Sequence, residues 1–589
     1  MKKLLIYLKN YRIQCFLAPL FKMLEAVFEL FVPLVIAYLI DHITASDAQG
    51  DNSFVLKCFV ILIVLGIVGL ISSCTAQFFA AKAATGFSRD LRHDLFKHLI
   101  NLSYSEIDDL GTSTMITRMT ADVNTVQNGV NMFLRLFLRS PFIVAGAVVM
   151  AFTIDVKAAL LFLVIVAVLF ITVGLIMKAN IPMLKKVQSG LDGILGLTRE
   201  DLSGARVIRA FNVEERRQDE FEEANGALAG TQLKAGYISG LLNPLTYVII
   251  NLAIVMLISI GNIQVSKGAL TTGGVVALYN YMSQILLELI KFANLIVTIN
   301  RALASANRIS DVFEITGADA SSASVDTPAA LRDSGEKYIL EFDDVSLRYM
   351  EGADEALSNI SFAVKEGETI GIIGGTGSGK SSLINMIPGF YKATSGTVYV
   401  DGQDIKTMDD DTLRGLVGVV PQKAVLFAGT IGDNLKWGNK DASDEDMEEA
   451  VRLSVAEDVV KTKGGLGADI EQGGRNLSGG QRQRLTIARA LVKKPRILIL
   501  DDSSSALDNM TDRTLRDNIK KLDYKPTVFI VSQRSASVRD ADRIIVLEDG
   551  MMAGIGTHTE LMKNCDVYRE IYESQFGKEM DETPERRAK

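Results

Sequence analysis

The chain has 589 residues, which is too long for a single hydrophobic core and predicts two or more domains. It is 48% hydrophobic and yet 22% charged, a combination that indicates a membrane part joined to a water-exposed part. The net charge of −8 gives no broad basic surface, so the composition argues against nucleic acid as a partner. The four cysteines are scattered along the chain, a pattern that excludes a disulfide framework and a cysteine metal cluster.

The N-terminal residues 1–14 combine positive charges with apolar side chains, but no short apolar core is followed by a small-residue cleavage site. We therefore expect an interfacial amphipathic helix that leads into the membrane, rather than a removable signal. Six apolar stretches of spanning length follow, and they lie at about 15–42, 54–81, 134–154, 158–178, 240–262 and 273–296.

The charges of the loops predict the orientation of these spans. The first short loop carries Asp47 and Asp51 but no Lys or Arg, whereas the N-terminus and the long loop at about 82–133 carry many. By the positive-inside rule, this long loop, the second one at about 179–239 and both termini are cytoplasmic. The membrane helices are therefore expected to extend well past the bilayer, within a transmembrane domain at 15–315.

The composition changes after the sixth span. Residues 316–337 are rich in Ala, Ser and Asp, which is typical of a flexible linker. From residue 338 to residue 589, short β-branched runs alternate with helical ones. This pattern predicts an α/β domain with a largely parallel core sheet, fused to the six-span helical domain.

A glycine-rich segment follows the apolar run "TIGII" and satisfies the pattern G-x-x-x-x-G-K-[ST] in its strand–loop–helix context. In such a loop the backbone N–H groups surround the phosphates of a nucleotide, the lysine reaches the β and γ phosphates, and the first serine hydroxyl binds Mg²⁺. The residues are Gly374, Gly375, Thr376, Gly377, Ser378, Gly379, Lys380, Ser381 and Ser382.

A matching acid lies downstream, where the apolar run "RILIL" ends in Asp501. This arrangement predicts a carboxylate that holds Mg²⁺ beside the phosphates of ATP. ATP and Mg²⁺ are accordingly the expected cofactors. The expected fold is therefore a six-span helical domain fused to an α/β P-loop nucleotide-binding domain at residues 338–589.

Between these two motifs lies "LSGGQRQRL", residues 477–485. Here the chain resembles the ATP-binding cassette (ABC) transporters, whose signature motif is LSGGQ. The resemblance implies that Tyr349 stacks on adenine, that Gln422 of the Q-loop contacts Mg²⁺ together with Ser381 and Asp501, and that Asp508 belongs to the D-loop "SALD". It covers nearly the whole chain, because "GTSTMITRMTADV" and "DLSGARVIRAFNVEE" resemble the two intracellular loops of the exporters.

Six spans fused to one cassette resemble an exporter-type half-transporter, which must pair with a second one. In this family each ATP lies between the phosphate loop of one chain and the signature of the other. The N-terminus of the signature helix faces a γ-phosphate that its own chain does not hold. We therefore expect Ser478, Gly479, Gly480 and Gln481 to contact the ATP of the partner.

Two residues depart from the family pattern. The catalytic glutamate that follows the magnesium acid is Asp502 here, and the switch histidine after "TVFIVS" is Gln533. Asp is one methylene shorter than Glu, and a misplacement of about 1 Å can cost about a hundredfold in rate. Since the signature is intact, the sequence predicts a degenerate, weakly hydrolytic site in one subunit of a heterodimer whose partner carries the competent site.

The expected cargo is a small hydrophobic or amphipathic compound, moved out of the cytoplasm or the inner leaflet of a bacterial plasma membrane whose lipids surround the chain. Intramembrane charges are candidates for cargo contact, and Glu29 and Glu288 are the candidates here. Two alternatives stay open. One is a peptide exporter, although no processing-peptidase domain precedes the first span, and the other is a nucleotide-gated channel or regulator, although no long regulatory insert separates linker and cassette.

Overall fold

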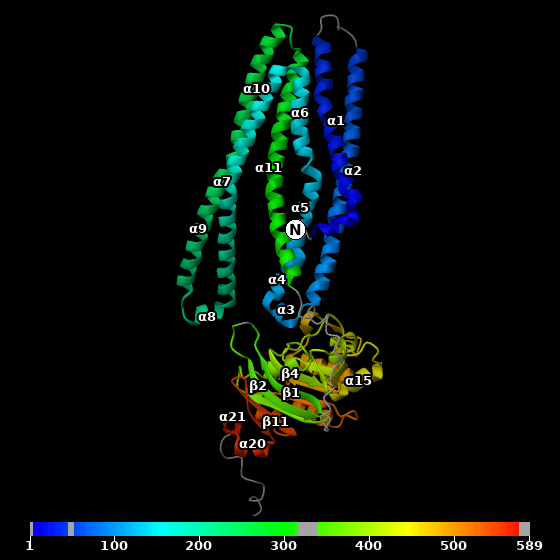
Figure 1. Ribbon diagram of the computed structural model, residues 1–589, viewed down its shortest axis with the longest axis vertical. Coiled ribbons are helices and arrows are strands. Elements are labelled where there is room, and N and C mark those ends of the chain that lie inside the picture. Colours follow the sequence, from blue (N-terminus) through cyan, green and yellow to red (C-terminus); the bar gives the residue numbers. More distant parts are fainter. Residues whose placement is uncertain (1–3, 45–51, 316–337, 351, 577–589) are drawn as a thin grey trace, which may run out of the picture. The chain divides into compact units, whose positions relative to one another are not determined.

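The computed structural model describes residues 4–44, 52–315, 338–350 and 352–576. They belong to two compact units, coloured blue to green and green to red along the chain in Figure 1. The first unit comprises Met1–Asn101 and Leu110–Ile315, and the second comprises Leu102–Asp109 and Thr316–Lys589. The predicted linker at 316–337 lies outside the described residues.

The first unit is built from long helices. In the described part of the chain, six helical segments of 41 to 53 residues are long and apolar enough to cross a membrane, which confirms the six predicted spans. About 20 residues suffice to cross the hydrocarbon core, so each helix continues beyond it, as predicted. The elements are η1 (Leu4–Tyr11), α1 (Arg12–Thr44), α2 (Asn52–Ile100), α4 (Thr112–Thr117), the π-helical turn η2 (Arg118–Asp122), α5 (Val123–Leu136), α6 (Arg139–Ile154), α7 (Val156–Ser203), α8 (Ala205–Ala210), α9 (Glu214–Gly240), α10 (Leu242–Ser266) and α11 (Thr272–Glu314).

The third span is interrupted, which the sequence analysis did not predict. Helix α5 ends at Leu136 and α6 begins at Arg139. The cause is Pro141, which has no N–H to donate to the carbonyl of Phe137, four residues before it. The break places Arg139 and Ser140 at the start of a new helix with both side chains buried.

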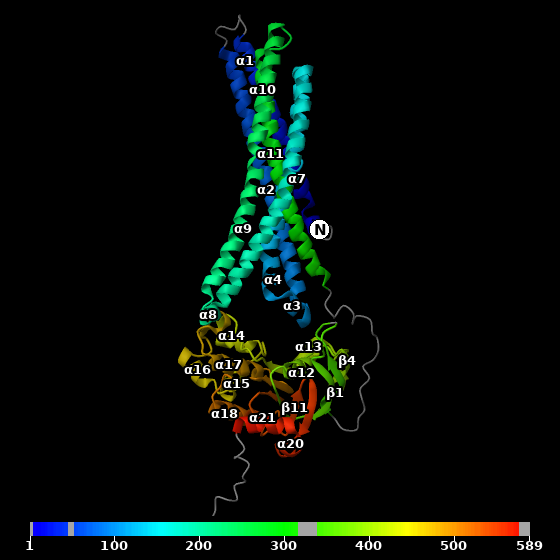
Figure 2. The ribbon, with the colours of Figure 1, turned by 90° about the vertical axis from the view of Figure 1, so that its left-hand side faces the viewer.

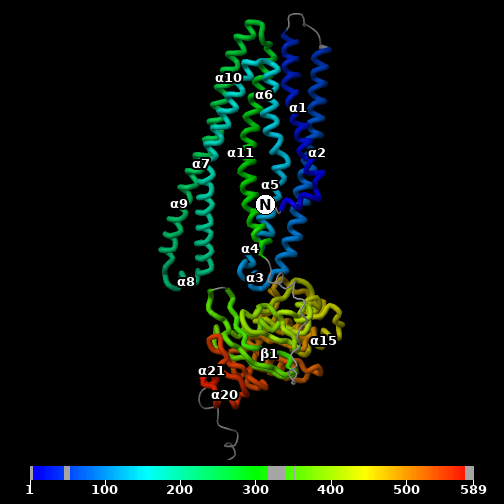
Figure 3. The backbone as a smooth tube through the Cα atoms, viewed as in Figure 1, coloured from blue at the N-terminus to red at the C-terminus, as the bar shows by residue number. Residues whose placement is uncertain are grey.

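Helix α11 packs along α1, α5 and α6 and supplies much of the buried core, to which Phe162 of α7 and Leu257 of α10 also contribute. Helices α7 and α9 run side by side to the short helix α8 (Figures 2 and 3). Around α8, Leu202, Val207 and Phe211 are 75%, 59% and 73% exposed, an unusual exposure for large apolar side chains.

The second unit contains two main sheets. One has the order β2-β1-β4-β5, and the other has the order β12-β11-β3-β10-β9-β6. The strands are β1 (Tyr338–Leu347), β2 (Leu357–Lys365), β3 (Thr369–Gly374), β4 (Ser395–Val400), β5 (Gln403–Asp404), β6 (Val417–Val420), β7 (Gly429–Thr430), β8 (Asp469–Ile470), β9 (Ile497–Asp501), β10 (Thr527–Val531), β11 (Arg543–Glu548) and β12 (Met551–Gly556). The helices are α12 (Lys380–Met386), α13 (Asp410–Leu416), α14 (Ile431–Lys436), α15 (Asp444–Leu453), α16 (Glu457–Lys463), η4 (Gln472–Gly474), α17 (Gly479–Val492), α18 (Asn509–Lys520), α19 (Ser535–Val538), α20 (His558–Asn564) and α21 (Asp566–Phe576).

The six-stranded sheet is parallel except for its edge strand β12, which confirms the predicted parallel core. Strand β10 lies between β3 and β9, and all three are almost fully buried. Because they are parallel, their carboxyl ends meet at one edge of the sheet. The segments that follow these three strands therefore lie close together, and they carry the predicted nucleotide motifs.

The residues Leu102–Asp109 cluster with the second unit although they lie between two membrane spans in the sequence. They include most of α3 (Tyr104–Leu110). The ring of Tyr104 stacks on that of Phe390 with a centroid separation of 4.2 Å, and Tyr391 Oη donates to Asp108 Oδ2 at 2.8 Å. The sequence analysis did not predict this grouping.

Candidate nucleotide site

The glycine-rich loop connects β3 to α12, as its pattern predicts. Gly377 and Gly379 have φ of +84° and +93°, a region that L side chains rarely adopt. A Cβ atom on Gly379 would also lie 2.7 Å from Leu357 Cδ2 and 2.8 Å from the carbonyl oxygen of Ala356. The loop can therefore keep its conformation only with glycine at these positions.

Lys380 is the first residue of α12, and its side chain turns back over the loop. Its Nζ donates to the carbonyl oxygens of Gly374 and Gly375 at 3.0 and 2.5 Å and to Ser378 Oγ at 3.3 Å. Burial lowers the pKa of the Lys380 ammonium, and the negative charges of Asp502 and Asp501 oppose that shift. The ammonium thus stands among oxygen acceptors, where a phosphate oxygen can replace them.

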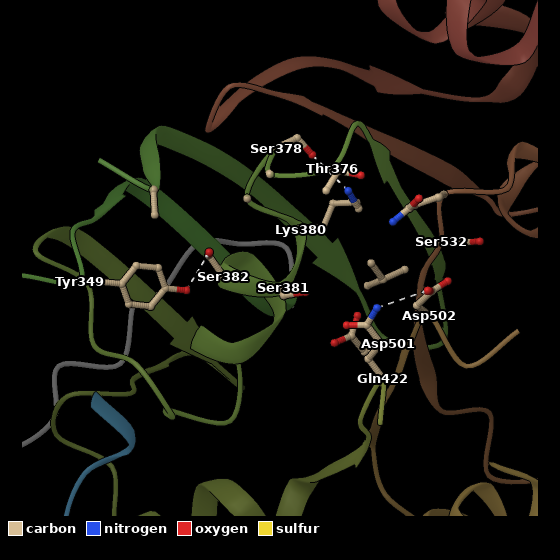
Figure 4. Close-up of a pocket in the computed structure, with 15 residues that line it drawn as sticks. Tyr349, Thr376, Ser378, Lys380, Ser381, Ser382, Gln422, Asp501, Asp502 and Ser532 are labelled. Atoms are coloured by element: carbon tan, nitrogen blue, oxygen red, sulfur yellow. Dashed lines mark hydrogen bonds between the residues drawn. The ribbon is translucent and has the colours of Figure 1, made fainter. Parts of the chain in front are cut away.

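The loop lines one side of a cavity of about 360 Å³ (Figure 4). This cavity brings together twelve of the residues predicted from sequence, which are Tyr349, Thr376, Gly377, Ser378, Gly379, Lys380, Ser381, Ser382, Gln422, Asp501, Asp502 and Gln533. Gly374 and Gly375 belong to the same loop but do not line the cavity.

Two carboxylates enter the cavity from the end of β9. Asp501 is buried, and its pKa is raised to about 6 by burial and by the charge of Asp502, while Lys380 acts in the opposite direction. Two adjacent acids in a partly buried site favour a cation beside them. The oxygens of Asp501, Ser381 and Gln422 form a hard donor set of the kind that Mg²⁺ prefers, so the residues present fit this ion.

Asp502 has an unusual backbone conformation, with φ of +42°. Its N–H donates to the carbonyl of Val531 at 3.0 Å, and Ser505 donates to its carbonyl from Oγ at 2.8 Å. Its Oδ2 lies 3.5 Å from Gln422 Nε2, the contact drawn as a dashed line in Figure 4. Among non-glycine residues, Asp and Asn tolerate this left-handed region best.

The segment after β10 carries the second departure from the family pattern. The side chain of Gln533 lines the cavity. The backbone around it is held by Gln575 of α21, whose Nε2 donates to the Gln533 carbonyl at 2.7 Å. Gln575 Oε1 accepts from Ser535 N and Ser535 Oγ at 2.8 and 2.9 Å. Gln575 could not be predicted from the sequence, because no local motif marks a residue whose role depends on a contact across 40 positions of the chain.

Tyr349 lines the opposite end of the cavity and is 42% exposed. Its Oη lies 2.8 Å from Ser382 Oγ. Its ring makes an edge-to-face contact with the ring of Tyr391, with a centroid separation of 5.0 Å. The ring therefore contacts two neighbours and stays partly exposed at the cavity, where it can stack on a flat base.

The LSGGQ segment does not line this cavity. Ser478 is the N-cap of α17 and forms a capping box with Gln481, in which Ser478 Oγ accepts from Gln481 N and Gln481 Oε1 accepts from Ser478 N. Gly479 and Gly480 form the first turn of the helix. Asp508 also lies outside the cavity and caps α18, where its carboxylate accepts from Met510 N and Thr511 N. Both motifs therefore form helix caps outside the chain's own phosphate cavity.

Comparison with known proteins decides the family. Residues 15–289 match the model of the ABC transporter transmembrane region, and residues 357–505 match that of the ABC transporter domain. The chain is 36% identical to YfiB of Bacillus subtilis, an ABC transporter ATP-binding protein, over 584 residues that cover 99% of this chain and 100% of YfiB. The chain belongs to the ABC transporters. It is a half-transporter of the exporter type, with a membrane domain and an ATP-binding domain in one polypeptide.

One further relative and one solved structure are also similar to this ABC transporter. It is 29% identical over 584 residues to YgaD of Bacillus subtilis, a putative multidrug export ATP-binding/permease protein, with 98% of this chain and 99% of YgaD covered. Its fold matches the solved structure of a bacterial Atm1-family ABC exporter with ATP bound, with a TM-score of 0.78 and 24% sequence identity over 96% of this chain and 99% of that chain. The ABC exporter fold and an integral inner-membrane location follow.

The two charged candidates in the membrane part of the transporter, Glu29 and Glu288, converge on one arginine. Arg139 Nη1 donates to Glu288 Oε1 at 2.6 Å, and Arg139 Nη2 donates to Glu29 Oε2 at 2.7 Å. Ser140 Oγ and Lys291 Nζ also donate to Glu288, both at 2.8 Å. Glu288 is 2% exposed, and its carboxylate accepts hydrogen bonds from these three donors. Glu29, in contrast, keeps 40% of its side chain exposed. Cargo contact by either residue stays a prediction.

Proposed function

We propose that this ABC half-transporter binds ATP at a weakly hydrolytic site and completes, with its intact signature, the competent site of a different half-transporter. The observation that carries the proposal is the pair Asp502 and Gln533, which line the phosphate cavity at the two positions where the family has Glu and His. The shorter carboxylate is drawn back from a water on the γ-phosphate, and the amide lacks the charge of imidazolium.

ATP binding is assigned to the residues around the cavity. The loop amides and Lys380 would hold the phosphates, and Tyr349 would stack on adenine. Mg²⁺ would be held by Ser381, Gln422 and Asp501, where it neutralises charge on the phosphates when bound. These side chains bind and orient the nucleotide, whereas hydrolysis needs the base and the switch residue that this site lacks.

A partner chain is supported by two features of the transporter. The capped N-terminus of α17 presents backbone N–H groups away from the chain's own cavity, so a second nucleotide site is needed to use them. The exposed apolar side chains of Leu202, Val207 and Phe211 around α8 belong to the second intracellular loop and need a covering surface. The competent site of the partner then explains why this chain keeps an intact signature.

The proposed cargo is a hydrophobic or amphipathic compound taken from the cytoplasm or the inner leaflet. The similarity to YgaD, described as a putative multidrug exporter, supports this class. ATP-driven closure of the two cassettes would change the access of the membrane cavity from inside to outside.

The proposal is tested by two substitutions in the isolated two-subunit complex. Asp502→Asn should leave most of the steady-state ATPase, because its site contributes little hydrolysis. Ser478→Ala should lower the ATPase by roughly tenfold or more, because it removes a preorganised donor from the site that works. Rates are measured at saturating ATP in liposomes.

A matched control is Thr514→Ala, which removes one exposed polar contact within α18, from Thr514 Oγ1 to the carbonyl oxygen of Met510, and touches none of the predicted site residues. It should leave the ATPase unchanged. Equal losses with Asp502→Asn and Ser478→Ala would contradict the proposal, because two identical competent sites would respond alike to both substitutions.

A further inference from the structure

The membrane unit contains a large groove that shares no residue with the nucleotide site. It has a volume of about 960 Å³ and lies between the N-terminal segment, α5 and α11. Its walls are almost entirely apolar, with Leu5 and Ile6 on one side, Phe133 on the second and Ile299 and Leu303 on the third.

The floor of the groove is made of small residues in close contact. A Cβ atom on Gly129 of α5 would lie 2.2 Å from Ala302 Cβ of α11, so these helices touch where the glycine lies. Ala302 and Ala306 are both buried. Because the floor consists of small residues and the rim consists of large ones, the concavity is built into the helix pair.

Two cations, Lys9 and Arg12, line the rim of the groove, and both are exposed. Neither forms a hydrogen bond or ion pair with any other residue that the structure describes. The neighbouring carboxylate of Asp90 is engaged by Arg89 and by Tyr11 Oη instead. An apolar groove with two uncompensated cations at its rim is complementary to an amphipathic anion.

The depth of the groove in the membrane indicates which amphipathic anions can reach it. Helix α11 leads to the nucleotide-binding unit, so its C-terminal end is cytoplasmic. The third span ends at Ile154 of α6, and the sixth span begins at Thr272 of α11. At 1.5 Å per residue, the groove residues of α5 and α11 lie about 30 to 50 Å from these two ends. A hydrocarbon core of about 30 Å and headgroup layers that bring the total to about 40–45 Å place the groove at the inner headgroup boundary.

We propose that this groove binds an anionic phospholipid of the cytoplasmic leaflet, with its phosphate between Lys9 and Arg12 and an acyl chain against Phe133 and Leu303. Basic pockets between membrane helices on the cytoplasmic side suit anionic headgroups. Helix η1 combines apolar side chains with Lys9 in its last turn, the composition of a segment that lies in the headgroup layer, and Arg12 follows it at the start of α1. Such a position would bring both cations to the depth of the phosphates.

A helix from a second copy of this chain fits the groove less well. At the same depth, α7 carries Lys178, Lys185 and Lys186, and α9 carries Lys234. No acidic residue lies between Asn180 and Val187 or between Ala224 and Ser266. Packing these helices against Lys9 and Arg12 would therefore bring like charges together.

The test compares lipid binding to the intact two-subunit transporter by native mass spectrometry, with dioleoyl-phosphatidylglycerol and dioleoyl-phosphatidylcholine as probes. Wild type should prefer the anionic lipid, and Lys9→Gln with Arg12→Gln should lose that preference, by roughly fivefold for each cation. The exchanged pair Lys9→Arg with Arg12→Lys should keep it. The matched control Lys185→Gln with Lys186→Gln, two cations at similar depth outside the groove, should also keep it.

Equal binding of the two lipids by wild type, or an equal loss in the control pair, would overturn the proposal. A photoreactive benzophenone side chain at Ile6 distinguishes the occupants. Cross-linking of this position to bound phosphatidylglycerol supports the lipid site, whereas cross-linking to a helix of the partner subunit overturns it.

Discussion

At the scale of single residues, the backbone of Asp502 bears directly on why this site has an aspartate. Its φ of +42° is tolerated by Asp better than by Glu. For most L-residues a left-handed conformation costs about 1–2 kcal/mol. Restoring the family's glutamate therefore lengthens the side chain toward the nucleotide but also strains the turn, unless the turn relaxes.

We predict that Asp502→Glu combined with Gln533→His raises hydrolysis at this site. The gain should stay below the roughly hundredfold that an ångström of misplacement can cost, because the strained turn consumes part of it. Single-turnover hydrolysis in a complex whose partner site is blocked measures it.

Asp502→Asn with Gln533→His is the matched control, since it has the histidine but no base. No difference between the control and the Glu variant would show that some other part of the site limits hydrolysis.

At the scale of elements, one charged group connects three helices of the membrane unit. Arg139 of α6 pairs with Glu29 of α1 and Glu288 of α11, and it is buried at the point where α6 begins after the break in the third span. Removing one partner of a buried ion pair leaves an uncompensated charge, which costs about 3–5 kcal/mol, whereas replacing both by apolar residues is often neutral.

We therefore predict that Arg139→Met and Glu288→Met each lower the Tm of the detergent-solubilised transporter, and that the double variant recovers most of the loss. Thermal unfolding followed by tryptophan fluorescence or by monomer loss measures this. A double variant no more stable than the singles would contradict the pairing.

The same variants distinguish a structural role of Glu288 from a role in cargo contact. If the double variant regains stability but not the transport of a cationic amphipath, a role of Glu288 in cargo contact gains support. Lys157→Met, which removes a charge near the N-terminus of α7, is the control for a change of charge alone.

At the scale of the whole molecule, features encoded by local patterns could be predicted and features that depend on distant contacts could not. Hydropathy predicted the six spans, and the glycine pattern predicted the loop in which Gly379 needs its positive φ. The hydrogen bonds from Gln575 to the segment after β10 depend on how α21 folds back, and no residue near Gln575 indicates them. The grouping of Leu102–Asp109 with the second unit could not be predicted from the sequence either, because it involves a ring contact between Tyr104 and Phe390, which lie far apart in the chain.

The central claim, that the nucleotide at Lys380 is bound but seldom hydrolysed, is tested most directly by the chemical form of the nucleotide at each site. The two-subunit complex is allowed to turn over a photoreactive, α-labelled ATP analogue and is then cross-linked, and the label is mapped to the two phosphate loops. The account predicts ATP on the peptide that contains Lys380 and ADP on the corresponding peptide of the partner. ADP in equal amounts on both peptides would contradict it.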